Sequence, residues 1–145
     1  MNPYIAIVLF PVPLTVADRF IAINQQAARR YQQLGADGNE ILQLADGAPK
    51  YGCLGLAGAI KIREDETLFM VVDRFRDKHH FLAIDDLASH DAACLALFDE
   101  LTEIIDISRS VRLELETAAL TPPASHAPEN APPPSCTGSP PAAPG

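Results

Sequence analysis

Five consecutive apolar residues, Leu68 to Val72 (LFMVV), constrain the fold more than any other feature of the sequence. The run is short and polar residues flank it, so it predicts a β-strand rather than a helix. Neighbouring residues of a strand point to opposite faces. Leu68, Met70 and Val72 therefore face one way, and the two residues between them face the other. Both faces of this strand need to be covered.

A second strand of the same kind is predicted from Tyr4 to Phe10 (YIAIVLF), again with apolar residues on both faces. Pro11 and Pro13 follow it. Proline has no backbone N–H to donate to a neighbouring strand, so we expect these two residues to end the strand.

A long amphipathic helix is predicted after this strand, because apolar residues recur every three or four positions from Val16 to Leu34. Thr15 precedes the first of them and is the expected N-cap. Gly35 follows the last and is the expected left-handed C-cap.

The remaining elements are predicted from shorter patterns. A more polar strand spans 39–45, and the glycine-rich stretch at 48–60 receives no assignment. Asp77 is the expected N-cap of a second helix, which Ser89 would restart as a new N-cap. Residues 111–116 (VRLELE) alternate, with the apolar set of Val111, Leu113 and Leu115 expected to point inward.

The order of these elements is β-α-β-β-α-β, which predicts a ferredoxin-like α+β fold with an antiparallel sheet. In that topology the first and third strands are central, in agreement with their apolar faces. Two helices cover only one face of the sheet, and the other face would be an apolar patch larger than monomers tolerate. We therefore expect a homodimer that packs sheet against sheet as an α+β barrel.

Composition divides the chain into a folded domain at 1–117 and a Pro/Ala-rich tail at 118–145, which we expect to be disordered. The net charge is −8 and Lys and Arg form no run, so nucleic acid is not an expected partner. No leader or membrane-spanning stretch is visible, and three unpatterned cysteines fit a reducing compartment. We expect a cytoplasmic protein that does not bind a membrane.

Several segments together resemble the YbaA-like family of uncharacterised bacterial proteins. These are FPVP at 10–13, LGA at 34–36, AIKIREDET at 59–67, and the Arg76 to His79 spacing after the apolar strand. The resemblance spans roughly residues 4–116 and implies the dimeric α+β barrel superfamily. It implies no particular reaction, although that superfamily includes cofactor-free monooxygenases and enzymes that degrade small molecules.

Three residues are candidates for binding a small anionic or aromatic ligand. Arg74 leaves the end of the central strand, and His79 lies in the first turn of the next helix, where free N–H groups and the helix dipole favour an anion. Tyr51, beside Gly52, could form the lip of a pocket. In the neighbouring pair of His79 and His80, one histidine is expected to be packed and the other solvated.

Two functions from different classes fit these observations. The first is a structural or regulatory dimeric module, since no catalytic constellation stands out. The second is a cofactor-independent small-molecule enzyme or ligand-binding protein with a cavity between the sheet and its helices. No phosphate loop, dinucleotide motif or metal site is visible, so we expect no cofactor and no metal. A filled core favours the first function, and a cavity with convergent polar groups favours the second.

Overall fold

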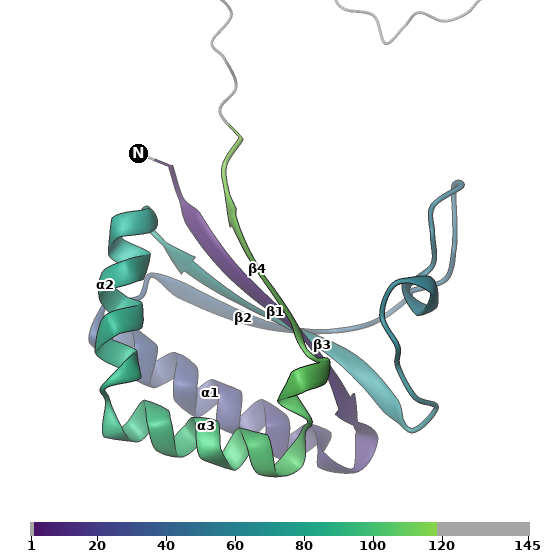
Figure 1. The fold of residues 1–145 in the computed structure, drawn as a ribbon, viewed down its shortest axis with the longest axis horizontal. Coiled ribbons are helices and arrows are strands. Elements are labelled where there is room, and N and C mark those ends of the chain that lie inside the picture. Colours follow the sequence, from purple (N-terminus) through teal and green to yellow (C-terminus); the bar gives the residue numbers. More distant parts are fainter. Residues whose placement is uncertain (1, 119–145) are drawn as a thin grey trace, which may run out of the picture.

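The computed structural model describes residues 2–118, so the predicted tail, apart from its first residue, lies outside the described residues. The sheet has four strands, and Figure 1 shows helices packed on one side of it. The main elements are β1 (Tyr4–Pro13), α1 (Ala17–Leu34), β2 (Gly38–Gln43), β3 (Glu66–Phe75), α2 (Lys78–Ser89), α3 (Ala92–Ile104) and β4 (Val111–Glu116). Three short 3-10 helices are η1 (Leu14–Val16), η2 (Leu56–Gly58) and η3 (Ile107–Arg109).

The strands are antiparallel and lie in the order β2-β3-β1-β4. This confirms the predicted ferredoxin-like fold, with the two most apolar strands at the centre. The second predicted helix is divided into α2 and α3, and both lie with α1 on one face of the sheet (Figure 1). Among the described residues, no helix has both the length and the apolar composition needed to cross a membrane.

The core fills the space between the sheet and the helices. Phe20 of α1 lies between Phe10 of β1 and Phe69 of β3, with ring centroids 5.2 and 4.9 Å apart. A second cluster joins Tyr4 and Phe75 to α2. Side chains that alternate along β1 and β3 therefore meet the apolar stripe of each helix, as strand and helix periodicity require.

The opposite face of the sheet, called the open face below, is also apolar. It carries Ile5, Ile7 and Leu9 of β1, and the β1–β4 register pairs them with Leu115, Leu113 and Val111 of β4. Val111 is 41% exposed and Leu115 43% exposed. The prediction that the apolar residues of β4 point inward to the core is therefore wrong. Apolar and charged residues do alternate along β4. The register with β1 places Arg112 and Glu114 on the helix side and the apolar set on the open face.

β1 continues through Pro11 to Pro13, so the prediction that the prolines end it is wrong. Pairing of β1 with β4 stops at Leu9, whereas pairing with β3 continues to Glu66. Over its last residues β1 has a strand on one side only, and proline is tolerated at such an edge.

The helix ends agree with the sequence at two of four expected caps. Gly35 has a φ of 116° and ends α1, and Asp77 accepts a hydrogen bond from His80 N at 2.8 Å. Thr15 is instead part of η1, and the N-cap of α1 is Val16, which makes no side-chain cap bond. Asp91 rather than Ser89 caps α3. It accepts from Cys94 N, and it also binds Arg30 of α1, which fixes the corner between α2 and α3.

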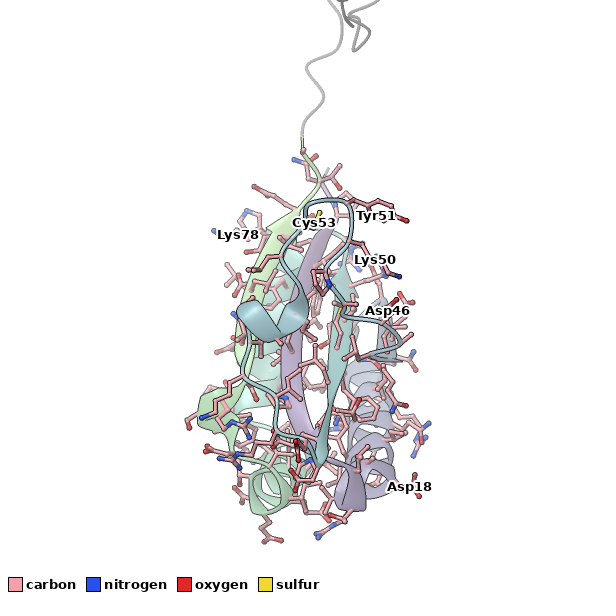
Figure 2. The ribbon with its side chains drawn as sticks, turned by 90° about the vertical axis from the view of Figure 1, so that its right-hand side faces the viewer. Asp18, Asp46, Lys50, Tyr51, Cys53 and Lys78 are labelled. Atoms are coloured by element: carbon pink, nitrogen blue, oxygen red, sulfur yellow. The ribbon has the colours of Figure 1, made fainter. Side chains whose placement is uncertain are left out.

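Residues 44–65, which connect β2 to β3, form a long excursion that we call the arm. It stands off the open face (Figure 1), and Figure 2 views it from the front, with the helices behind the sheet. The arm is held by its own hydrogen bonds, among them Leu56 N to Gly47 O and Cys53 N to Lys50 O, both 2.8 Å. It contains the stretch at 48–60 that the sequence left unassigned.

Candidate functional site

A cavity of about 400 Å³ lies between the sheet and the helices α1 and α3. Its wall is mainly apolar, which is the usual character of a site for a small molecule. Among the described residues, six polar side chains interrupt this wall, and they come from α1, from the strands β2 and β3, and from the β4 segment. The polar and charged residues that line the cavity are Asn24, Tyr31, Asn39, Asp73, Ser110 and Arg112.

Among residues 2–118, Asp73 is the one carboxylate on the cavity wall. It lies on the helix-facing side of the central strand β3, in register with Asn39 of β2, whose Nδ2 donates to Asp73 Oδ1 over 2.7 Å. Burial raises the pKa of Asp73, and the hydrogen bond from Asn39 offsets only part of that rise. A carboxylate in such a setting is a stronger base than one in water, because the fold disfavours its charge.

Tyr31 of α1 brings a phenol to the same cavity. Burial raises its pKa to about 12, and the negative charge of Asp73 adds to the rise. Its hydroxyl is therefore neutral at physiological pH and can donate a hydrogen bond. Cys94 of α3 also lines the cavity, and burial raises the pKa of its thiol to about 11. This thiol is protonated near neutral pH, so it is not an activated nucleophile.

Ser110 marks the other end of the cavity, just before β4 begins. Its Oγ is buried and has no hydrogen-bond partner among the described residues. Such groups are rare in native structures and call for an occupant that can hydrogen bond. On β1, Ala6 pairs with Asp73, and one more step of the β1–β4 register brings Ser110 beside Phe10. Ala6 and Phe10 are four residues apart, so at about 3.4 Å per residue Asp73 and Ser110 lie roughly 14 Å apart along the strands.

The cavity meets solvent on the side of α3 and β4. Of its lining residues, Phe98, Ile107 and Arg112 are exposed, and all three come from this side. Arg112 forms an ion pair with Glu114, and its guanidinium carbon lies 5.8 Å from the centre of the Phe81 ring. The mouth of the cavity therefore combines the aromatic ring of Phe98 with the positive charge of Arg112.

The three ligand-binding residues predicted from the sequence are not among the residues that line this cavity. Tyr51 is 97% exposed at the tip of the arm. Arg74 follows Asp73, so it lies on the opposite face of the sheet, where it pairs with Glu40 at 2.7 Å. His79 is exposed on α2. The structure does not bring these three together, and their ligand-binding role stays a prediction.

The prediction of one packed and one solvated histidine is confirmed. His80 is buried, its Nδ1 accepts from Arg76 N at 3.0 Å, and its Nε2 lies 2.8 Å from Gly35 O. These contacts give His80 a structural role that joins the start of α2 to the end of α1. His79 makes no such contact among residues 2–118.

Sequence reasoning missed Asp73, although a signal for it exists. Phe69 and Val71 share one face of the central strand, and the same alternation places Asp73 and Phe75 on that face. A single carboxylate within an otherwise apolar row is a candidate for function, since charged residues are seldom buried without a reason. Asn39 has a weaker signal, because only the strand register reveals its partner.

The strand order and the helices on one face of the sheet define a ferredoxin-like α+β protein. No protein-family model matches the sequence, and no curated protein matches it either. The chain is similar in structure to SnoaB, a cofactor-independent oxygenase from Streptomyces nogalater. The TM-score is 0.53 at 12% identity, covering 82% of this chain and 97% of that one.

Two further solved structures are similar. One is a putative antibiotic biosynthesis monooxygenase from Nitrosomonas europaea, with a TM-score of 0.51 at 15% identity over 81% of this chain and 98% of that one. The other is a dimeric ferredoxin-like protein of unknown function from Jannaschia sp., with a TM-score of 0.54 at 15% identity over 81% and 100%. At these identities the likeness is one of fold.

Proposed function

We propose that this protein is a small-molecule enzyme that binds a largely apolar substrate in the cavity between the sheet and the helices. The observation that carries the proposal is the cavity itself, about 400 Å³ in volume, with a carboxylate, a phenol and an amide on an apolar wall. A purely structural module has no need for such a space, because an empty cavity lowers stability. The cavity therefore favours the second of the two functions inferred from the sequence.

Asp73 is the proposed proton acceptor. Its raised pKa matches a general base better than an ordinary carboxylate does, because the driving force for proton transfer increases with the pKa of the base. Asn39 holds one carboxylate oxygen in place, and the other makes no hydrogen bond to a described residue. Tyr31 can donate a hydrogen bond to the substrate oxygen on which negative charge develops.

This chemistry and the similar structures support one reaction class as the first to test. Removing a proton turns a weakly acidic substrate, such as a phenol or an enol, into an electron-rich anion. SnoaB is a cofactor-independent oxygenase, so dioxygen is the first co-substrate to test with this protein. We also propose that the chain is a member of the YbaA-like family, supported by the segments at 10–13, 34–36 and 59–67 and by the shared superfamily fold.

We further propose that the protein is a homodimer formed through the open face. Ile5, Ile7 and Leu9 form an apolar row at its centre, and Leu42 of β2 lies 46% exposed at its margin. A second copy that packs sheet against sheet would bury these residues. The Jannaschia protein is described as dimeric and has the same fold, which supports this arrangement.

Ligand-induced thermal shifts across a panel of phenols and small aromatic carboxylates test the proposed site. We expect hits in the wild type that disappear in Ala28→Phe, because a phenyl group at this lining position of α1 fills the cavity without changing any charge. Asp73→Asn should retain binding of the hits but lose any oxygen consumption they support.

Arg74→Ala and His79→Ala are the matched controls, since both side chains are exposed and outside the cavity. Hits that survive Ala28→Phe but are lost in either control would move the site to the sequence-predicted position. If no member of the panel shifts the melting temperature of the wild type, the structural or regulatory function becomes the better account.

A further inference from the structure

The arm carries the most exposed large apolar and aromatic side chains of the described residues. Tyr51 is 97% exposed at its tip and Leu54 is 73% exposed. Figure 2 shows Tyr51 and Cys53 at the end of the arm, well in front of the sheet. Side chains this exposed contribute little burial energy to the fold of a single chain.

Tyr51 also adopts an unfavourable backbone conformation. Its φ is 58°, and no other residue except glycine has a positive φ in the described part of the chain. A tyrosine in the left-handed region is strained, because its Cβ approaches the carbonyl oxygen. The adjacent Gly52 has a φ of 80°, and the hydrogen bond from Cys53 N to Lys50 O closes a turn with Tyr51 and Gly52 at its centre, where glycine or asparagine is the usual first residue. The turn directs the ring of Tyr51 into solvent, where it is available for contact with another molecule.

The arm and the open face lie on the same side of the molecule. Residues 59–61 and 63 of the arm line a small pocket with Val111 of this face, and Arg109 Nη2 donates to Lys61 O over 3.0 Å, but the tip of the arm leaves much of the face exposed. Leu42, Val111 and Leu115 stay exposed on the sheet although the arm stands in front of it. Two sheets packed face to face lie about 10 Å apart. An arm that stands off this face must then pass alongside any second sheet packed on it.

We propose that the arm of each copy contacts the outside of the partner copy, with Tyr51 and Leu54 as the contact residues of its tip. This inference rests on the proposed homodimer, and the occupant of the space between the arm and the open face is a second copy of this chain. The central residues of the open face are uncharged, and Glu40 and Arg74 at its margin neutralise each other. Two copies with a net charge of −8 each can therefore meet there without burying like charges.

The test is the dimer dissociation constant of Tyr51→Asn, measured by sedimentation velocity across a dilution series of the full chain. Asparagine tolerates a positive φ better than tyrosine, so the substitution relieves strain within the single chain. We expect the dissociation constant to rise about ten-fold or more, because tyrosines at interfaces are often hot spots. The melting temperature extrapolated to the monomer should be unchanged or higher.

Leu82→Asn is the matched control. It replaces a leucine that is 49% exposed on α2, on the other side of the sheet. The wild type could be a dimer while Tyr51→Asn weakens dimerisation no more than Leu82→Asn does. That result would overturn the role of the arm but not the proposed dimer. A wild type that is monomeric at micromolar concentration would overturn the dimer and the role of the arm together. Neither result bears on ligand binding in the cavity.

Discussion

Asn39 and Asp73 lie opposite each other on β2 and β3, and the amide of Asn39 donates to the carboxylate of Asp73 over 2.7 Å. This one bond does not compensate for the burial of the charge, and the pKa of Asp73 is raised. Ionisation of Asp73 therefore costs the folded state stability.

Asp73→Asn should stabilise the protein at neutral pH while abolishing turnover. Because the folded-state pKa of Asp73 is raised, the folded state binds more protons than the unfolded state, and stability falls as pH rises through that pKa. Asp73→Asn has no carboxylate at this position, so it does not lose stability in this way. Over the range from pH 4 to pH 8, its advantage in melting temperature should start near zero, grow until the pH passes the folded-state pKa of Asp73, and then stay constant. Thermal melts of both proteins across this range measure the difference, and a variant less stable than the wild type at pH 8 would contradict the prediction.

Glu66→Gln should destabilise the protein at neutral pH. Glu66 at the start of β3 is 3% exposed, and Arg109 binds it through two nitrogen–oxygen contacts of 2.6 and 2.7 Å. The bonds from Arg109 lower the pKa of Glu66 to about 2. Replacing the carboxylate weakens both bonds, and we expect a loss of about 1–3 kcal/mol in chemical denaturation.

The pH dependence of the Glu66 contribution has the opposite sign to that of Asp73. A lowered pKa means that the stabilisation is complete above the ordinary value of 4.5 and is lost as pH falls from there towards about 2. The stability difference between wild type and Glu66→Gln should shrink over this window. A difference that stays constant down to pH 2.5 would show that the ion pair does not act through the charge of Glu66.

His80→Ala and His79→Ala should differ sharply although the residues are adjacent. His80 is buried and joins Arg76 N to Gly35 O, so its removal leaves two backbone groups without partners and a hole in the core. We expect a loss of about 2–4 kcal/mol for His80→Ala and less than about 0.5 kcal/mol for His79→Ala. Urea unfolding of the two variants provides the comparison, and equal losses would disprove the structural role of His80.

Ile7→Glu should dissociate the proposed dimer without unfolding the chain. Ile7 lies on the open face, where a glutamate in a single copy remains in contact with water. In a sheet–sheet interface the same carboxylate would be buried without a partner, which raises the dissociation constant about 100-fold or more. Sedimentation velocity should show a monomer, and the far-UV circular dichroism spectrum should match that of the wild type. A dimer that survives this change would have to use another surface.

The fold was predictable because its signals are local. Short continuous apolar runs over Tyr4 to Phe10 and Leu68 to Val72 identify two central strands, and a stripe of period 3.6 identifies α1. Alternation alone does not say which face of an edge strand meets the helices. The assignment of Val111 and Leu115 to the core therefore failed, because their face is set by the register with β1.

The site was less predictable, because it depends on contacts between distant segments. Asp73 meets Asn39 only through the pairing of β2 with β3, and Ser110 reaches the cavity only after η3 has turned the chain. Arg74 and His79 were proposed from their places at a strand end and a helix start. Those places are correct, but such positions are common, and burial rather than position distinguishes Asp73.

The anchoring of α3 decides how a ligand reaches the cavity. At the start of α3, Arg30 of α1 forms an ion pair with Asp91. After the last turn of α3 comes η3, where Arg109 forms an ion pair with Glu66 of β3. With both ends tied, the helix cannot swing outward as a lid, and passage must depend on side chains near its middle, where Phe98 stands exposed over the cavity. The rate of ligand exchange should then follow the bulk of residue 98 and increase in Phe98→Ala. The residence time of a ligand would be set by one rotating ring rather than by a moving helix.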